Sequence, residues 1–335
     1  MQIIDFFKTD GFSLAELTQG INIIPNQFGL LNSMGLFVDE GITQRTAIVE
    51  YDKLTLNLLG TKTWGSPGDT NKMGGRIAKN FAIPHIPLND RLTPEDLQGR
   101  RAFASTSAED AAYLLNKKMT EIRAKHDQTL EWMKLGVLKG SITDGNGTVI
   151  LAPYTEFGIS QTSVGFALTT TSTEVLTKCL SVKRTIELAL TGTPWSGEIM
   201  CICGSGFYDA LSTHTVVKAA FANWNALQNN YSDYRKAFMF GGIRFQEYNG
   251  TVPDASGASQ ALVGTDDAYF FPLGTNLFRT FFAPADFMET VNTVGIPYYA
   301  KTELSEFGRG VKVHTQSNPL PICLKPGVIV KGTKV

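Results

Sequence analysis

The first candidate for chemistry in this chain is the segment Gly204-Ser205-Gly206. It follows an apolar stretch and precedes a helical pattern, where the amide groups of a glycine-rich turn can hold a phosphate. The segment lacks the third glycine of a dinucleotide-binding loop and the Lys-Ser/Thr ending of a P-loop. Cys203 also stands where a nucleophile elbow would need glycine. We therefore expect a tight strand-to-helix turn at this place.

Cysteine and acidic residues are the next candidates. Cys201 and Cys203 share one face of an expected strand, but no CxxC pair and no neighbouring histidine completes a metal site. We expect both to be buried packing residues. Asp266 and Asp267 precede another expected strand, and we expect them to shape the turn before it rather than bind a cation.

The histidines are scattered along the chain and share no motif with an acid or a nucleophile; they are His85, His126, His214 and His314. His126 lies on an apolar helix stripe, where packing against another segment is expected and pH sensing is the alternative. The residue pattern predicts no catalytic residue, no metal site and no cofactor.

The composition describes a folded protein of two or three lobes. The chain has 335 residues, 43% of them hydrophobic and 18% charged, with a net charge of −1. A protein that binds nucleic acid by neutralising phosphates would carry a basic excess. The densest basic group, Lys117-Lys118 with Arg123 and Lys125, is interleaved with Glu121 and Asp127. We expect that group to be a solvated helix face.

The four cysteines in this long chain are too few for a disulfide framework and suit a reducing compartment. The first residues lack the basic and apolar regions of a signal peptide. The longest apolar runs are far shorter than a membrane span. We expect a protein that is made in the cytoplasm and has no membrane partner.

The elements that must position these residues begin with an arm and a hairpin. Residues 1–43 are expected to form an extended arm with one short helix, capped by Ser13 with Glu16 three residues on. Residues 43–58 and 76–86 alternate as strands do, and the glycine-rich segment Gly60 to Gly75 lies between them. The pattern predicts a long protruding hairpin, which cannot bury both of its faces alone.

A long helix follows, expected over residues 108–138 with Gly140 as its stop. Its length corresponds to roughly 46 Å at 1.5 Å per residue. The apolar stripe along it consists of Leu115, Met119, Ile122, His126, Leu130, Met133 and Val137. A stripe of this length needs a broad surface to pack on, so we call the element the spine helix and expect it to support an assembling subunit.

The second half predicts an α/β lobe. We expect a helix over residues 172–190, a buried strand over 198–203 and a helix over 207–227 that breaks near 212–215. Strands are expected near 148–152, 156–159, 243–248 and 268–273. The tail segments 310–315 and 327–331 are expected to rejoin the earlier strands beside the spine helix.

The order of these elements resembles the phage major capsid protein E family, the lambda-like coat proteins. The N-terminal part of the resemblance lies in Pro25, Leu36-Phe37, Thr43 and Ile48-Val49-Glu50, followed by Met133-Lys134 and Leu138-Lys139-Gly140. The C-terminal part lies in Tyr298-Tyr299-Ala300-Lys301, Gln316-Ser317, Pro319-Leu320-Pro321 and Lys325-Pro326-Gly327. Each piece alone is weak, whereas their order and spacing are specific.

This resemblance implies an α+β protein with the Hong Kong 97-type capsid fold. The implied parts are an N-terminal arm (1–43), an extended β-hairpin loop (44–88), and a peripheral domain (89–164) with the spine helix 108–138. An axial α/β domain (165–300) would surround hexamer and pentamer axes. The tail (301–335) would return to the peripheral domain.

The resemblance also implies partners. The family assembles as hexamers and pentamers into an icosahedral head shell around double-stranded DNA, with a portal at one vertex. A separate scaffolding protein is expected, because the sequence shows no N-terminal scaffold-like coiled segment, and some shells carry a decoration protein. As residues that meet a neighbouring subunit we expect Lys62, Trp64, Met73, Leu36 and Phe37. Lys62 and Lys72 could form a covalent cross-link, but no motif identifies an acceptor.

Two other classes of function remain. An encapsulin-like compartment would use the same fold to hold an enzyme and would differ in its cargo. An unrelated α/β enzyme would need an acid, a base and a nucleophile that converge in the axial lobe. The sequence supports the structural shell subunit over both.

Overall fold

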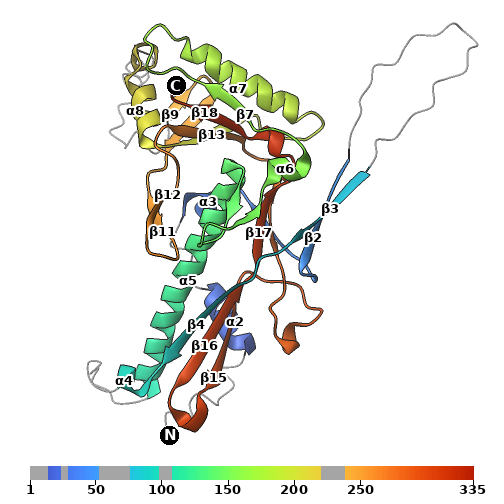
Figure 1. Cartoon of the computed structure of the whole chain (residues 1–335), viewed down its shortest axis with the longest axis vertical. Helices are drawn as coiled ribbons and strands as arrows, with labels where there is room; N and C mark the ends of the chain where they lie inside the picture. Colours follow the sequence, from blue (N-terminus) through green and yellow to red (C-terminus); the bar gives the residue numbers. More distant parts are fainter. Residues whose placement is uncertain (1–13, 24–28, 53–75, 98–107, 220–237) are drawn as a thin grey trace, which may run out of the picture.

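The computed structural model of the chain describes residues 14–23, 29–52, 76–97, 108–219 and 238–335. The molecule is elongated (Figure 1), with an α/β lobe at the end where α7 and α8 lie. Helix α5 (Ala108–Lys139) is the spine helix and runs from this lobe towards the other end. Its bounds agree with the expected 108–138, and every residue of the expected apolar stripe is buried.

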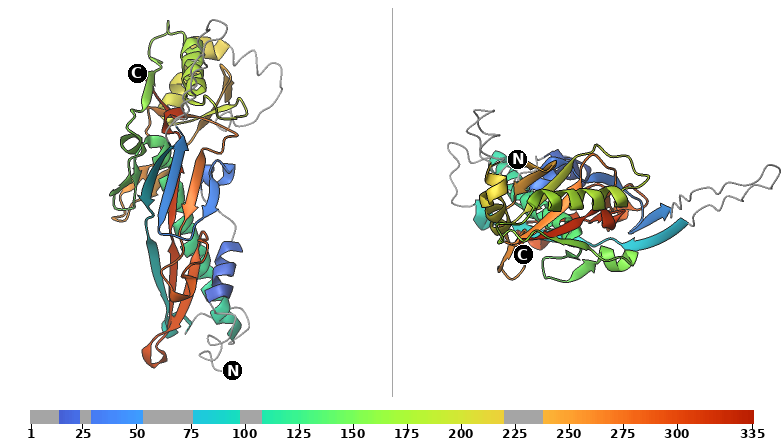
Figure 2. Two further views of the ribbon diagram at one scale, coloured as in Figure 1. Left: turned by 90° about the vertical axis from the view of Figure 1, so that its right-hand side faces the viewer. Right: turned by 90° about the horizontal axis from the view of Figure 1, so that it is seen from above.

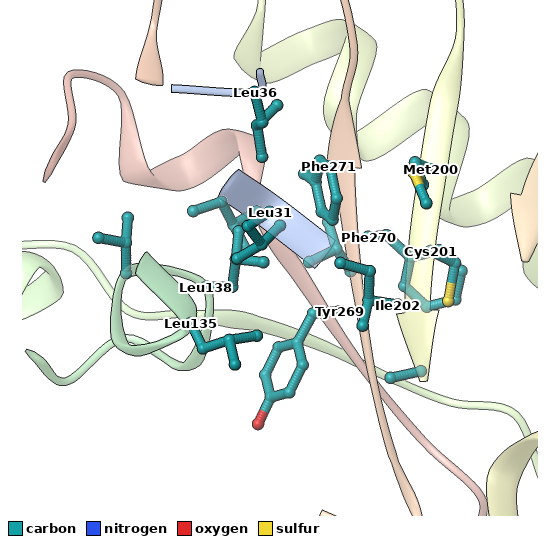
Figure 3. Packing of buried hydrophobic residues seen from close by; sticks show 14 of the residues in the cluster. Leu31, Leu36, Leu135, Leu138, Met200, Cys201, Ile202, Tyr269, Phe270 and Phe271 are labelled. Carbon is teal, nitrogen blue, oxygen red and sulfur yellow. The ribbon is translucent and has the colours of Figure 1, made fainter. Parts of the chain in front are cut away.

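The lobe is built on a six-stranded sheet with the order β7-β18-β13-β8-β10-β9. Its strands are β7 (Thr162–Gly165), β8 (Ile199–Cys203), β9 (Phe238–Phe240), β10 (Ile243–Glu247), β13 (Asp267–Pro272) and β18 (Val330–Thr333). All five residues of β8 are buried, because β10 and β13 flank it and helices cover the sheet. Figure 3 shows β8 and β13 side chains packing together with Leu135 and Leu138 of the spine helix.

Two helices of the lobe agree with the expectations. Helix α7 (Val175–Ala189) buries Val175, Cys179, Val182 and Ile186, which recur at steps of three and four. Helix α8 (Ser205–Thr213) ends before His214, and a second helical stretch starts at residue 215. The expected break near 212–215 is therefore confirmed.

A three-stranded sheet lies beside the half of the spine helix that is farther from the lobe (Figure 1). Its order is β15-β16-β4, from β15 (Tyr299–Leu304), β16 (Val311–Ser317) and β4 (Ile86–Leu92), all antiparallel. Leu115, Met119 and Ile122 of the spine helix are buried against this sheet together with Val311 and Val313. Helix α2 (Leu14–Ile23) packs on β15.

The arm and the middle of the molecule share a second three-stranded sheet, with the order β1-β14-β17. Strand β1 (Val38–Gly41) runs parallel to β14 (Phe278–Phe282), which pairs with β17 (Pro319–Cys323). The shorter elements are α3 (Leu30–Met34), α4 (Pro94–Leu97), α6 (Pro153–Phe157), the pairs β5 (Ile142–Thr143)–β6 (Val149–Leu151) and β11 (Thr251–Pro253)–β12 (Ser259–Ala261), and the 3-10 turns η3 (Met288–Thr290), η4 (Glu306–Gly308) and η5 (Pro326–Val328).

The expected hairpin is present at its base. Strand β2 (Thr46–Asp52) pairs antiparallel with β3 (Arg76–Ala82), from Thr46 opposite Ala82 to Asp52 opposite Arg76. Ala47 and Val49 are buried on one face, whereas Ile48 on the other face is 52% exposed. The pair of strands projects away from the rest of the molecule (Figure 2).

Two expectations about elements are wrong. Residues 153–157 form helix α6 where a strand was expected from residue 156. Pro153 at the first helical turn presets a helical backbone, and Gly158, with φ of 66°, ends the helix. In the tail, β16 does lie beside the spine helix, but β18 pairs with β13 and β7 in the lobe. The residue period predicts that a segment is a strand, but it does not predict which strand that segment pairs with.

The division into five domains remains a prediction, and the strand pairing adds detail to it. The expected boundary between residues 164 and 165 falls inside β7. Strand β14 lies within the expected axial range 165–300, and β15 begins within it. Yet β14 pairs with β17 and β15 pairs with β16, and neither pair belongs to the lobe sheet. The chain therefore leaves the lobe sheet after β13 and returns to it with β18.

Candidate assembly site

The Gly204-Ser205-Gly206 segment is a tight turn, as expected. The amide groups of Gly204 and Phe207 donate hydrogen bonds to the carbonyl oxygens of Asp267 (3.0 Å) and Thr265 (3.0 Å). A Cβ atom at Gly204 would collide with the carbonyl oxygen of Gly264. The residues before β13 therefore occupy the start of α8, in the place that a phosphate would need.

The other candidates for chemistry also have structural roles. The four cysteines are buried and unpaired, and burial raises the pKa of the Cys201 thiol. Lys331 forms an ion pair with Asp267 (3.0 Å), and Lys334 forms an ion pair with Asp266 (3.4 Å). Both carboxylates therefore bind the C-terminal segment to the turn before β13. Within the described residues no cluster of three or more His, Cys, Asp or Glu could hold a metal ion.

The most concentrated polar chemistry of the described chain lies between the spine helix and the arm. Arg123, Asp127, Glu131 and Lys134 follow each other at steps of four, four and three along one side of the spine helix. Asp127, Glu131 and Lys134 are at most 5% exposed. We call these four residues, with the arm segments they hold, the arm contact.

Glu131 is the centre of the arm contact. Its carboxylate accepts hydrogen bonds from the amides of Leu31 (2.8 Å) and Asn32 (2.9 Å) at the start of α3, and from the Tyr248 hydroxyl (3.0 Å). Burial raises the pKa of the Glu131 carboxyl, and these three hydrogen bonds oppose the shift. Gly29 must be glycine here, because its φ is 102° and a Cβ atom would collide with the Glu131 side chain.

Arg123 and Asp127 hold the other arm helix. The Arg123 guanidinium pairs with Asp127 Oδ1 (2.9 Å) and donates to the carbonyl oxygen of Ile21 at the end of α2 (2.7 Å). The Tyr298 hydroxyl donates to the same Asp127 oxygen (2.6 Å), and the guanidinium lies 3.8 Å from the Tyr298 ring centroid. The arm is thus bound at both of its helices by charged side chains of the spine helix.

Lys134 completes this set without a close ion pair in the described chain. Burial lowers the pKa of its ammonium group, and Asp39, Glu131 and Asp127 oppose that shift. Its ammonium lies 5.4 Å from the ring centroid of Phe37, within the range of a cation–π contact. The positive charge of Lys134 therefore offsets the negative charges of Asp39, Glu131 and Asp127 at the end of the arm contact nearest the lobe.

The expectation of a solvated helix face is thus right for Lys117, Glu121 and Lys125, which are exposed, and wrong for Arg123 and Asp127. Sequence reasoning missed the arm contact as a site. The available signal was the spacing of Arg123, Asp127 and Glu131, which places three charges one helical turn apart beside the apolar stripe.

His126 is packed against another segment, as expected. It is 4% exposed, and its Nε2 lies 3.1 Å from the Thr315 hydroxyl of β16. Burial and the neighbouring Arg123 lower the pKa of His126 to about 4. The imidazole is consequently neutral in the folded protein at neutral pH.

Two of the residues expected to contact a neighbouring subunit are buried within the subunit itself. Leu36 and Phe37 are 7% and 6% exposed, and Phe37 packs edge-on against Phe278 at 5.4 Å between ring centroids. Little of either side chain remains for a neighbour. Lys62, Trp64, Lys72 and Met73 lie outside the described residues, so their roles remain predictions. Among the helices of the described chain, none is long and apolar enough to cross a membrane.

Comparison with known proteins adds family evidence to this geometry. Residues 13–334 match the model of the family described as phage major capsid protein E. The chain is 29% identical to the major capsid protein of Pseudomonas phage KPP10, over 96% of this chain and 97% of the relative. It is 26% identical to the major capsid protein of Salmonella phage Felix O1, over 95% of each.

Solved structures share the fold at much lower identity. The mature capsid of bacteriophage PhiM1 matches with a TM-score of 0.56 at 9% identity, over 91% of this chain and 87% of the other. The capsid of cyanophage P-SCSP1u matches with a TM-score of 0.53 at 12% identity, over 92% and 89%. The fold is therefore that of phage capsid subunits.

Proposed function

Since the chain belongs to the phage major capsid protein E family, we propose that it is the coat subunit of a tailed-phage head and that its copies assemble into an icosahedral shell. The observation that carries this proposal is the length of the family match, residues 13–334. A match over a single lobe would leave room for a different activity in the rest of the chain. Here the arm, the hairpin, the spine helix and the lobe are all included.

The geometry supports a subunit that is completed by its neighbours. Hairpin β2–β3 has no third strand in the described part of the chain, and only one of its faces, that of Ala47 and Val49, packs on the subunit core. A two-stranded sheet is marginally stable in water unless further elements cover it. Its exposed face, with Ile48 at 52%, has no cover from the described part of the chain. A neighbouring copy would supply that cover in a shell.

The partners follow from this role. Hexamers and pentamers of the chain would form the faces and vertices of the shell, with a portal at one vertex. A separate scaffolding protein would guide assembly, and a decoration protein could bind the outside. With a net charge of −1, the subunit would meet packaged DNA through weak and non-specific contacts.

The experiment is electron microscopy of the purified protein in negative stain. A coat subunit gives closed shells or capsomer rings, and particles from infected cells contain DNA. An encapsulin-like compartment would also give closed shells but would contain a protein cargo, which mass spectrometry of the contents identifies. A monodisperse small oligomer would contradict a shell role and favour the α/β enzyme.

A variant tests the expected role of the hairpin. Trp64→Ala should leave the melting temperature of the isolated subunit unchanged and prevent shell formation, because aromatic residues in interface pockets are frequent anchors. Trp195→Ala is the matched control, since Trp195 packs partly buried on the subunit core. It should lower the melting temperature instead. Normal yields of shells from Trp64→Ala would show that Trp64 has no interface role.

A further inference from the structure

A cavity of about 510 Å³ lies where the arm, the lobe sheet and the turn between β13 and β14 meet. All three parts supply apolar side chains to its lining: Leu36 of the arm, Met200 of β8 and Leu273 of the turn. Figure 3 shows Leu36 and Met200 among the side chains of the core. Sites for small ligands in proteins have volumes of about 300–1,000 Å³ and combine apolar walls with a few polar groups. The cavity therefore has the size of a ligand site.

Four polar side chains also line the cavity, and they come from two elements: Arg244 and Gln246 from β10, and Thr275 and Asn276 from the turn. Arg244 and Gln246 are two residues apart, so both side chains lie on one face of the strand. The guanidinium of Arg244 and the side-chain amides of Gln246 and Asn276 form no hydrogen bond or ion pair with a described residue. Their donors are therefore available to a ligand.

Thr275 gives a second and independent sign of a ligand. Its side chain is 7% exposed, and its hydroxyl has no hydrogen-bond partner in the described chain. Because the hydroxyl is also out of reach of bulk water, its burial costs free energy that a valine of the same shape would avoid. Rotation about χ1 exchanges the positions of the hydroxyl and the methyl group, so a molecule in the cavity can supply the missing partner.

The turn that carries Thr275 has a fixed conformation. Gly274 has φ of 67°, and a Cβ atom there would lie 2.8 Å from the Cβ atom of Ser196. The amide of Leu273 donates to the carbonyl oxygen of Glu198 (2.9 Å), and the Ser196 hydroxyl donates to the carbonyl oxygen of Leu273 (2.9 Å). A ligand would enter a site whose walls are already in place, which reduces the entropy lost on binding.

The charge of the lining indicates the chemistry of the ligand. Arg244 is the one charged residue among the described residues that line the cavity. It is exposed, whereas Leu36 and Met200 are 7% and 2% exposed, so the cation faces solvent and the apolar groups lie inside. A guanidinium binds a carboxylate through two parallel hydrogen bonds. A phosphate monoester carries a charge of about −1.5 to −2 and would favour a second cation, which this lining lacks.

We propose that this cavity binds a ligand that carries one carboxylate next to an aliphatic group. Arg244 pairs with the carboxylate, Gln246 and Asn276 donate further hydrogen bonds, and the aliphatic group contacts Leu36 and Met200. Two sources have this chemistry: a free organic acid, and an acidic side chain beside an apolar one in a peptide segment. The inference goes beyond the proposed function and does not depend on it, since one subunit contains the whole site.

The first test measures binding to the purified protein by ligand-observed NMR. The probes are hexanoate, as the free acid, and the capped tripeptide acetyl-Leu-Glu-Leu-amide, as the peptide segment. At least one should bind with a Kd of about 1 mM or lower, and the tighter of the two identifies the source. Hexanamide and acetyl-Leu-Gln-Leu-amide keep the shape without the charge and should bind about tenfold more weakly or less. No binding of either acid at about 10 mM, or equal binding of acid and amide, would overturn the proposal.

The second test assigns the binding to the cavity. Arg244→Gln should raise the Kd about tenfold or more, because the charge-assisted pair is lost. Thr275→Val should raise the Kd about threefold or more while the melting temperature stays unchanged or rises, since no unpaired hydroxyl is buried. Arg184→Gln, at an exposed position of α7, is the control and should bind as wild type does.

Unchanged binding by Arg244→Gln, or an equal loss of binding in Arg184→Gln, would place the ligand elsewhere and overturn the proposal. A protein that forms shells but binds neither acid would contradict this site and leave the proposed function standing.

Discussion

The core of the α/β lobe and the arm contact hold the same subunit together by opposite means. In the lobe, Phe166 stacks on Phe270 (5.4 Å between centroids), and Phe270 meets Phe245 edge-on (5.9 Å). All three rings are fully buried. In the arm contact, buried charges of the spine helix hold backbone groups of the arm.

The two regions should therefore respond differently to pH and to the loss of a single side chain. Apolar packing depends little on pH, and its stabilisation grows with the area buried. Buried charges are costly to desolvate and stabilise only when every partner is in place. The lobe is therefore expected to be the constant part of the subunit, and the arm contact the part that changes with pH or with loss of one side chain.

The largest effect should come from the lobe. Phe270→Ala should lower the free energy of unfolding by about 3–5 kcal/mol, because a full aromatic ring leaves a cavity between two other rings. Urea unfolding of the isolated subunit measures it. Tyr113→Ala, at a ring that is 71% exposed on the spine helix, is the control and should change little. A loss below about 1 kcal/mol for Phe270→Ala would mean that the lobe core repacks.

In the arm contact, Glu131→Ala should cost about 3 kcal/mol, since it leaves two amides and a hydroxyl without their acceptor. Hydrogen exchange at Leu31 and Asn32 should speed up, while the amides of β8 stay protected. Glu121→Ala, at an exposed position of the same helix, is the control. Exchange that rises equally in β8 and the arm would show that the two regions do not unfold separately.

A pH effect should come from His126, which lies next to the arm contact on the spine helix and packs on β16. The pKa of His126 is about 4 in the folded state, against an ordinary value of 6.5, so between these values the unfolded chain binds more protons. Stability is then full above pH 6.5 and falls as the pH falls towards 4. At about 1.4 kcal/mol per pH unit, wild type should lose about 2 kcal/mol more than His126→Asn between pH 6.5 and 5. Parallel pH profiles of the two proteins would contradict the lowered pKa.

The smallest effect should come from a charge pair at the edge of the lobe. Lys331 pairs with Asp267 at 3.0 Å, but both side chains are about a third exposed. Lys331→Ala should therefore cost about 0–1 kcal/mol and lose its effect at high salt. If Lys331→Ala lowered the free energy of unfolding as much as Glu131→Ala, partly exposed and buried charges would contribute equally to stability.

Periodicity was sufficient where one element faces one surface. The spine helix follows from its stripe at steps of three and four, and β8 from an uninterrupted apolar run. The base of the hairpin follows from an imperfect alternation, with Ala47 and Val49 on the buried face. Helix α6 did not follow, because its five residues are too few to show a period and Pro153 alone marks its start.

The sequence by itself determined the spine helix, the base of the β2–β3 hairpin, helix α7, strand β8 and the family, since these depend on local patterns and on residue types. Only the tertiary structure decided that Arg123, Asp127 and Glu131 face the arm and that β18 joins the lobe. The physical reason is that pairing and burial join residues far apart in the chain. A charged side chain has the same local pattern whether water or another segment of the chain covers it.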